Sequence, residues 1–154
     1  MTLTGRLDPR AGWQAAECPI ARSLDVVRNR SAFLILREAF YGTTRFDDFG
    51  ARAGISESVA AARLKDLVAA GLLEQHPYRR PGERTRYEYR LTEMGADFLP
   101  VLTAMMQWGE RWLGPVPVRM QHHDCGGEVH AEVRCVNGHK LAPSDIDLVS
   151  RRER

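Results

Sequence analysis

The most constraining feature of the sequence is a pair of helical patterns joined by a tight turn. The first pattern starts after Arg45 and ends at Gly54, a residue type that commonly ends helices. The second starts after Ser56, a residue type that caps helices, and stops at Gly71. Two short helices connected through a glycine turn predict a helix-turn-helix. The apolar side of the second helix is expected to consist of Val59, Leu64, Leu67 and Val68.

The spacing of the apolar residues changes directly after the second helix, which indicates that strands follow. Residues 72–76 (LLEQH) and 86–91 (RYEYRL) have the pattern of strands, and Pro81-Gly82 marks the turn between them. A β-hairpin placed directly after a helix-turn-helix predicts a winged helix. The segment 76–90 contains five Arg against two Glu, a net charge of +3, so the wing is expected to be basic.

Helical patterns also precede and follow this region. A first helix is expected near Pro19, and a second, apolar on most of its sides, after a cap at Ser31. A long helix is expected from about Ala96 to Leu113, and from Val118 onward polar and apolar residues alternate over short distances. The predicted fold class is therefore mainly α with a small β-hairpin wing, plus a small β-rich C-terminal appendage.

Composition narrows the class of protein further. The chain has 154 residues and 44% hydrophobic residues, enough for one domain with its own core. No apolar run approaches the ~20 residues of a transmembrane helix, and the first residues lack the apolar stretch of a secretory signal. Three cysteines are an odd number and do not suit an extracellular disulfide framework. We therefore expect a cytoplasmic protein without a membrane partner.

Several short stretches match the pattern of one bacterial regulator family. They are residues 18–25 (CPIARSLD), 34–38 (LILRE), 42 (G), 45–47 (RFD), 54–56 (GIS), 63–64 (RL), 67 (L), 71–74 (GLLE) and 87–95 (YEYRLTEMG). Through these stretches, residues 17–113 resemble the HxlR family of winged-helix transcription regulators, relatives of the MarR group. The resemblance implies a homodimer that presents two winged helices to double-stranded DNA. Such a dimer most often acts as a repressor on an inverted repeat.

The resemblance and the local patterns together divide the chain into four expected parts. Residues 1–16 are expected to form a leader or dimerisation arm, 17–95 the winged helix-turn-helix, 96–114 a dimerisation helix and 115–154 the β-rich extension. The chain departs from the family pattern at Asn29-Arg30-Ser31, where the family usually has Gly, a basic residue and Trp.

The second helix of a helix-turn-helix meets base edges in the major groove with its N-terminal residues. The expected base-reading residues are Ser56, Glu57, Ser58, Ala61 and Lys65, together with Ala62. Because alanine side chains offer methyl contacts alone, DNA shape is expected to carry part of the specificity. For Ser56, a pure helix cap is an equally good interpretation.

Basic side chains around these helices are candidates for phosphate and minor-groove contacts. The resemblance implies that Arg63 approaches the phosphate backbone, and the alternative is a salt bridge to Asp66 or Glu74. Arg45 is a further phosphate candidate, and Thr43 and Thr44 could add hydroxyl donors. The wing arginines are expected in a minor groove, where the negative potential favours Arg: Arg79, Arg80, Arg84 and Arg86.

Cys18, at the entry to the first helix, is a candidate redox or electrophile sensor. A helix N-terminus favours the reactive thiolate, and Arg22 one turn further on would add to this effect. The resemblance points the same way, because some members of the family use a cysteine at this position as a sensor. The alternative is an unreactive small core residue.

A small-molecule effector is the other candidate signal. The Trp that Ser31 replaces leaves space that Phe33 or Trp13 fills, or that a ligand occupies. Aromatic and Met side chains on the last helix are residue types that line apolar ligand sites. The candidate pocket consists of Trp13, Ser31, Phe98, Leu102, Met105, Met106, Trp108 and Trp112. The alternative for the helical residues is a plain core or a dimer seam.

The C-terminal segment holds thiols and imidazoles, which are ligands that Zn²⁺ prefers. The candidate ligands are His123, Cys125, Cys135 and His139, although their C-x9-C-x3-H spacing is not that of a standard knuckle. The alternative is that the cysteines pack or pair on oxidation, and no cofactor is expected.

Two other classes of function compete with a DNA-binding regulator. The sequence contains no Gly-rich phosphate loop, nucleophile elbow or HExxH motif, so an enzyme is not expected. The alternative is a winged helix that binds proteins without specific DNA binding. An acidic wing would favour that alternative, whereas this wing is basic.

Overall fold

The computed structural model describes residues 2–3, 18–79, 81–82 and 84–149. It divides into two compact units, of which one is Ser23–Leu102 and the other combines Met1–Arg22 with Thr103–Arg154. The first unit contains the predicted helix-turn-helix and hairpin. Within the described residues, none of the helices combines the length and the apolar character needed to span a membrane.

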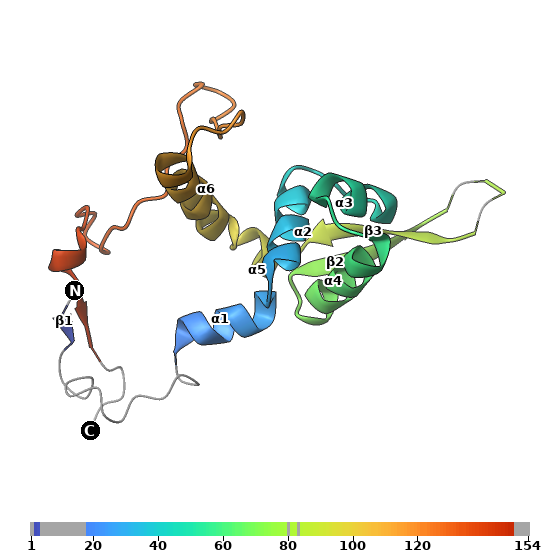
Figure 1. The fold of residues 1–154 in the computed structure, drawn as a ribbon, viewed down its shortest axis with the longest axis horizontal. Helices are drawn as coiled ribbons and strands as arrows, with labels where there is room; N and C mark the ends of the chain where they lie inside the picture. Colours follow the sequence, from blue (N-terminus) through green and yellow to red (C-terminus); the bar gives the residue numbers. More distant parts are fainter. Residues whose placement is uncertain (1, 4–17, 80, 83, 150–154) are drawn as a thin grey trace. The chain divides into compact units, whose positions relative to one another are not determined.

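The first unit is mainly helical and contains one antiparallel hairpin (Figure 1). The elements in chain order are α1 (Pro19–Val27), α2 (Arg30–Phe40), α3 (Phe46–Ala53), α4 (Glu57–Ala69), β2 (Leu73–Tyr78), β3 (Arg86–Leu91), α5 (Glu93–Ala96) and α6 (Leu99–Leu113). Two of these helices span both units, because α1 begins in the second unit and ends in this one, and α6 begins in this unit and ends in the second. The predicted fold class, a mainly α winged helix-turn-helix, is confirmed.

Local capping chemistry sets where the helices start. Asn29 Oδ1 accepts a hydrogen bond from the Ala32 N–H at 3.1 Å, so Asn29 caps α2 and the prediction of Ser31 as its cap was wrong. Asn29 and Ser31 are both cap-type residues, but the hydrogen bond that Asn29 accepts makes the helix begin before Ser31. At α4 the predicted cap is confirmed, because Ser56 Oγ accepts from the Val59 N–H at 3.4 Å.

The long helix predicted from Ala96 to Leu113 is wrong in its first turn, where α5 and α6 are separate helices. Pro100 has no N–H to donate to the Ala96 carbonyl, whereas a proline fits the first turn of a new helix. The Phe98 N–H instead donates to the Gly95 carbonyl at 3.1 Å, which forms a tighter turn.

The hairpin extends two residues further than the sequence predicts. β2 runs to Tyr78, which pairs with Arg86, although Pro77 interrupts the pattern. Pro77 lies opposite Tyr87, and the Tyr89 N–H donates away from β2 to the Thr44 carbonyl at 2.8 Å. Residues of an antiparallel strand point their backbone N–H and C=O groups alternately toward and away from the partner strand. The backbone groups of Tyr87, like those of Tyr89, therefore point away from β2, and Pro77 removes no hydrogen bond of the ladder.

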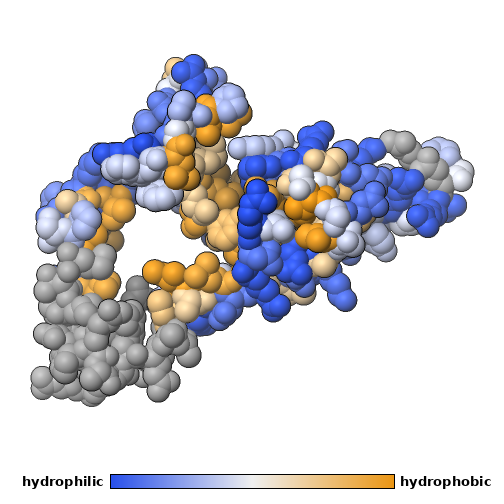
Figure 2. Space-filling view, in the orientation of Figure 1, coloured by the Kyte–Doolittle hydropathy of each residue, from blue (hydrophilic) through white to orange (hydrophobic). Residues whose placement is uncertain are grey.

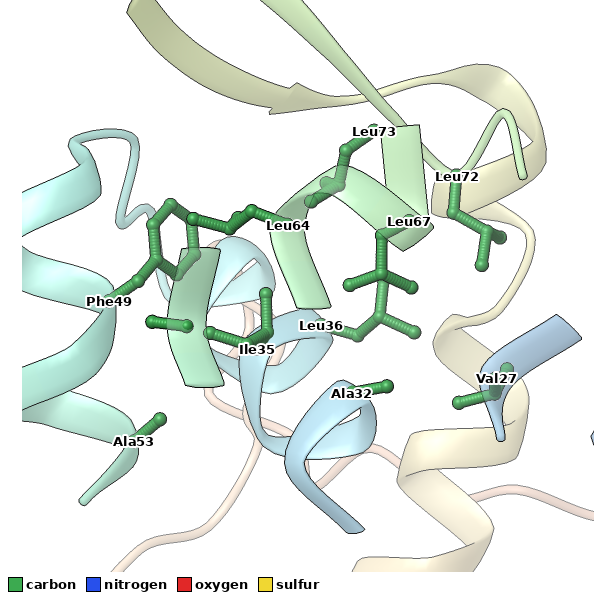
Figure 3. Packing of buried hydrophobic residues seen from close by; sticks show 11 residues of the cluster. Val27, Ala32, Ile35, Leu36, Phe49, Ala53, Leu64, Leu67, Leu72 and Leu73 are labelled. Atoms are coloured by element: carbon green, nitrogen blue, oxygen red, sulfur yellow. The ribbon is translucent and has the colours of Figure 1, made fainter. Parts of the chain in front are cut away.

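The core of the first unit lies around α2, which packs against α3, α4 and β3. Ile35 and Leu36 of α2 have no exposed surface, and Figure 3 shows them between Phe49 of α3 and Leu67 of α4. The buried apolar residues are Val27, Ala32, Ile35, Leu36, Phe49, Ala53, Ala60, Leu64, Leu67, Leu72 and Leu73. This packing holds the two helices of the helix-turn-helix and the base of the hairpin together.

The second unit contains the start of α1, the rest of α6 and a C-terminal extension whose described residues have little regular secondary structure. In its described part, β1 (Thr2–Leu3) pairs in parallel with β4 (Asp147–Leu148), and a 3₁₀ turn covers Pro143–Asp145. Isolated bridges join two more pairs, Gln121 with Glu128 and Arg134 with Lys140. The β-structure of the extension is thus made of short pieces.

Two polar side chains organise this extension. Gln107 of α6 accepts a hydrogen bond from the Ala131 N–H at 2.9 Å, which ties the extension to the helix. Glu132 accepts from Lys140 Nζ and from Arg134 Nη2, each at 2.6 Å. These two cations, Lys140 first, lower the pKa of the Glu132 carboxyl from its ordinary value.

Candidate nucleic-acid interface

The N-terminal turn of α4 presents the predicted base-reading side chains to solvent. Ala60, Leu64 and Leu67 of α4 are buried in the core, so the opposite side of the helix faces solvent. Ser56 Oγ caps the helix and lies 3.1 Å from Ser58 Oγ. The exposed residues of this face include every predicted base reader: Ser56, Glu57, Ser58, Ala61, Ala62 and Lys65.

Val59 belongs to this exposed face, so its predicted place on the apolar side was wrong. Its side chain is 38% exposed, whereas Ala60, one position further on, is 1% exposed. One residue corresponds to a rotation of about 100° around a helix, which separates the two side chains. Val59 is therefore a further candidate for contact with a thymine methyl group. The sequence feature that could have indicated this is a larger apolar side chain directly before Ala60 and Ala61.

Arg63 lies at the edge of the exposed face of α4 and is partly buried. Its Nη1 lies 3.1 Å from Asp66 Oδ2, so the salt bridge considered from the sequence is present. A guanidinium carries five N–H donors, and one ion pair does not use them all. A phosphate contact and the pair with Asp66 are thus compatible.

A buried polar network fixes the turn that leads into α3. Glu38 is 5% exposed and Thr43 is 3% exposed. The predicted phosphate contact of Thr43 was therefore wrong, because its side chain is buried. Thr43 Oγ1 donates to Glu38 Oε2 at 3.4 Å and accepts from Arg52 Nη1 at 3.3 Å. Arg37 forms an ion pair with the same Glu38 carboxylate. The network sets the direction in which the next two residues, Thr44 and Arg45, leave the core.

Thr44 and Arg45 join the start of α3 to the wing. The Thr44 carbonyl accepts a hydrogen bond from the Tyr89 N–H at 2.8 Å. The backbones of Arg45 and Glu88 pair in an isolated antiparallel β-bridge. The Arg45 guanidinium lies 5.3 Å from the centre of the Tyr78 ring, a cation–π contact that the sequence analysis missed. A basic residue of the helix-turn-helix and the wing are therefore adjacent.

The wing carries exposed arginines beyond the bulk of the helices. Arg79, Arg84 and Arg86 are exposed, and Figure 2 shows hydrophilic surface along the hairpin. Arg80 lies outside the described residues. Arg86 Nη1 is 3.4 Å from Asp47 Oδ2, an exposed pair that the screening of water keeps weak.

Cys18 directly precedes α1 and is partly buried. Its carbonyl accepts a hydrogen bond from the Arg22 N–H at 3.1 Å. The thiol is free and sits at a helix N-terminus, as the sequence predicts. The position suits a reactive cysteine, and the sensor role remains a prediction.

The predicted effector residues separate into two groups. Phe98 and Leu102 pack against the core, where the Phe98 ring lies 5.6 Å from that of Phe33. Ser31 and Met106 are partly exposed, and Trp13 lies outside the described residues. Exposed apolar side chains elsewhere on α6 include Met105, Trp108 and Trp112, at 51%, 60% and 64% exposure.

The predicted zinc ligands do not meet in one cluster. Cys135 Sγ lies 3.4 Å from His139 Nδ1. Among the described residues, the ligand atoms that gather within 4.8 Å are those of His122, His123 and Asp124, all exposed. His123 thus has neighbours other than the predicted cysteines.

Comparison with known proteins places these features in one family. The model of the HxlR-like helix-turn-helix family matches residues 26–117. An HTH-type transcriptional regulator of Mycobacterium tuberculosis (strain ATCC 25618 / H37Rv) is 40% identical over 124 residues, which cover 78% of this chain and 75% of the relative. One from Synechocystis is 36% identical over 97 residues, or 62% of this chain and 70% of the relative.

Solved structures agree with this assignment. The crystal structure of PA1607, a proposed transcription factor, matches with a TM-score of 0.78 and 39% identity over 89% of this chain and 96% of that chain. The redox regulator HypR in its oxidised form matches with a TM-score of 0.55 and 27% identity over 61% of this chain and 96% of that chain. The chain therefore belongs to the HxlR-like helix-turn-helix family of DNA-binding transcriptional regulators.

Proposed function

We propose that this regulator binds an inverted repeat as a homodimer and acts as a repressor. In each protomer α4 enters the major groove and the wing reaches the adjacent minor groove. The observation that carries the proposal is the exposed N-terminal turn of α4 on a helix whose other side is held in the core. The basic wing supplies the positive charge that phosphates attract.

The proposed contacts follow from where each side chain lies. Base edges meet Ser56, Glu57, Ser58, Val59, Ala61 and Lys65, which share the exposed face of α4. Phosphates meet Thr44, Arg45 and Arg63, and the minor groove receives the wing arginines Arg79, Arg84 and Arg86, to which the sequence adds Arg80. Winged-helix residues 17–95 would thus bind DNA, while residues 1–16 and 96–114 would serve the dimer and 115–154 would form an extension.

Two alanines on α4 test this orientation with the same substitution. Ala61 lies near the N-terminus of the helix and Ala69 at its C-terminal end, and both are exposed. Ala61→Glu should weaken binding to the DNA upstream of the gene by about tenfold or more, because a carboxylate beside phosphates is repelled. Ala69→Glu should leave the affinity nearly unchanged. Equal affinities of the two variants in a mobility-shift titration would reject the proposed orientation.

The proposed dimer rests on the exposed apolar side chains of α6. Trp108, Trp112 and Leu113 are 60%, 64% and 77% exposed, and large apolar residues gathered on one helix are typical of an interaction site. A two-fold dimer buries the same surface of both protomers. Such a dimer presents two copies of α4 to two half-sites about one helical turn of DNA apart.

The proposed signal is oxidation or alkylation of Cys18. Support comes from its place at the N-terminus of α1 and from the likeness to HypR, whose printed description is a redox regulator. Modification of the thiol by a peroxide or quinone should release DNA from the wild type but not from Cys18→Ser. Release from both forms, or from neither, would move the search for a signal to a small-molecule effector.

A further inference from the structure

Three side chains of the kind that bind metal ions meet on one tight turn of the C-terminal extension. His122, His123 and Asp124 each offer one ligand atom, and these three atoms lie within 4.8 Å of one another. All three residues are exposed, so an ion can reach them from solvent. Among the described residues, no other set of three His, Cys, Asp or Glu side chains gathers this closely. The turn belongs to the second unit alone.

Backbone hydrogen bonds fix the shape of this turn. The backbones of Gln121 and Glu128 pair in an isolated antiparallel bridge at its base. The His122 N–H donates to the Gly127 carbonyl at 2.8 Å, and the Gly126 N–H donates to the His122 carbonyl at 2.9 Å. Gly126 has φ 68°, a left-handed conformation that glycine adopts without strain. The chain therefore reverses direction in a backbone that its own hydrogen bonds hold.

The turn brings the three side chains together, although they are neighbours in the chain. Neighbouring residues of a strand point to opposite faces, whereas residues 123–125 form a turn. The centres of the His122 and His123 rings lie 5.2 Å apart. Asp124 Oδ1 lies 2.7 Å from His123 Nε2, and Asp124 Oδ2 lies 3.9 Å from His122 Nε2. Each oxygen of the carboxylate is therefore close to a different imidazole.

These separations suit a tetrahedral metal ion. Imidazole nitrogen and carboxylate oxygen bind Zn²⁺ at about 2.1 Å, so two ligand atoms of one tetrahedral ion lie about 3.4 Å apart. The two distances between the carboxylate and the rings, 2.7 Å and 3.9 Å, fall on either side of that value. Exposure leaves room for water in the fourth position, as in zinc sites with three protein ligands.

Two other exposed histidines have a carboxylate neighbour but lie in no such group of three. His76 Nε2 lies 2.8 Å from Glu74 Oε1, and His130 Nε2 lies 4.0 Å from Glu128 Oε2. Neither pair gains a third ligand within the part of the chain that the structure describes. The pair of His76 and Glu74 is therefore a matched comparison for the turn, because it has the same chemistry with one ligand fewer.

We propose that His122, His123 and Asp124 form a Zn²⁺ site in the C-terminal extension. Two imidazoles and one carboxylate suit Zn²⁺, whereas Mg²⁺ prefers oxygen ligands alone. The bound ion replaces the direct contact between the carboxylate and the rings. This site differs from the one that sequence spacing suggested, because Cys135 Sγ lies 3.4 Å from His139 Nδ1 and both residues are outside the group of three.

Binding of Zn²⁺ is measured by calorimetry on the full chain without an affinity tag, in the presence of a phosphine reductant that keeps the thiols reduced. Zn²⁺ should bind with a dissociation constant of about 10 μM or tighter. Mg²⁺ should bind about a hundredfold more weakly, because it dehydrates reluctantly and gains little from imidazole. Equal affinity for the two ions would overturn the proposal, since attraction to a carboxylate would then explain the binding.

Single substitutions of exposed side chains locate the ion. His123→Ala and Asp124→Asn should each weaken Zn²⁺ binding by about tenfold or more, because each removes one ligand. His76→Ala removes an imidazole that also has a carboxylate neighbour and should leave the affinity unchanged. Circular dichroism checks that all variants are folded. An equal loss in His76→Ala, or no loss in the two variants of the turn, would overturn the site.

A cysteine site is the alternative that the experiment must separate from this one. Cys135→Ser should bind Zn²⁺ as tightly as the wild type, because Cys135 lies outside the group of three. Co²⁺ serves as a spectroscopic probe, since a cobalt–thiolate bond gives a charge-transfer absorption that nitrogen and oxygen ligands do not give. The wild type should lack this absorption when one equivalent of Co²⁺ is bound. A thiolate absorption, or a tenfold loss of Zn²⁺ affinity in Cys135→Ser, would reject the proposed ligands.

Discussion

Gly95 is the glycine, among the described residues, at which an added Cβ would meet its closest neighbour. A Cβ atom at this position would lie 2.1 Å from the carbonyl oxygen of Leu72 and 3.1 Å from Leu91 Cδ2. The Gly95 N–H is bound by Thr92 Oγ1 at 3.0 Å, and the Thr92 hydroxyl donates to the Gly71 carbonyl at 2.5 Å. These bonds hold α5 against the loop between α4 and β2, which prevents the glycine from moving aside.

Gly95→Ala should therefore destabilise the fold by about 1–3 kcal/mol, the usual cost of an added methyl group in a tight site. Urea denaturation measures the change. Gly109→Ala is the matched control, because a Cβ there meets no heavy atom within 4 Å and alanine favours the helix. A Gly95→Ala variant as stable as the wild type would contradict the close approach to Leu72.

The cap residue was predicted correctly from the sequence at α4 and incorrectly at α2. Ser56 was predicted as a cap because it is a cap-type residue at the point where the helical pattern of α4 begins. At α2, Asn29 and Ser31 are both cap-type residues, and only the hydrogen bond to the Ala32 N–H selects Asn29. The Arg45–Tyr78 contact joins residues far apart in the chain, so no local pattern indicates it.

The wing is the element whose contribution to DNA binding is easiest to isolate. Arg84 is exposed near the turn of the hairpin. Each phosphate contact releases counterions, so the logarithm of the affinity falls with the logarithm of the salt concentration. This slope counts contacts, which a single affinity does not.

Arg84→Ala should reduce that slope by about 0.9 for the phosphate contact it removes. Mobility shifts over a series of salt concentrations give the slope. Lys140→Ala removes an equal charge from the C-terminal extension, where it pairs with Glu132, and should leave the slope unchanged. An identical slope in Arg84→Ala and the wild type would show that Arg84 does not contact a DNA phosphate.

Element boundaries were predictable where turn chemistry marks them. Gly54 ends α3 in the left-handed conformation at φ 65°, which glycine adopts without strain, and the sequence indicated that end correctly. The break between α5 and α6 was missed because apolar periodicity continues across it. Pro100 was the available signal for a new helix start.

At the scale of the whole molecule, the exposed apolar residues of α6 bear on how two chains assemble into a dimer. Trp108 and Trp112 expose most of their surface, and a dimer would remove this apolar area from water. Sequence periodicity placed these side chains together on one helix but did not separate them from Phe98 and Leu102, which pack on the core. That separation depends on contacts with α2, which a single-helix pattern does not contain.

Replacing both exposed tryptophans, Trp108→Glu with Trp112→Glu, should weaken the dimer by at least about tenfold, because charges are depleted from interface cores. Sedimentation equilibrium measures the dimer dissociation constant. Val136→Glu changes a fully exposed apolar residue of the C-terminal extension and serves as the control. If the double variant remained as dimeric as Val136→Glu, the interface would lie elsewhere.

In the proposed complex, two copies of the exposed N-terminal turn of α4 read an inverted repeat, with the wings beside them. Hydroxyl-radical footprinting on the DNA upstream of the gene tests it most directly, with Ala61→Glu in parallel. We predict two protected half-sites about one helical turn, or 10–10.5 base pairs, apart, and loss of both in the variant. Protection that is no tighter than on unrelated DNA, or that survives Ala61→Glu unchanged, would contradict this mode of DNA binding.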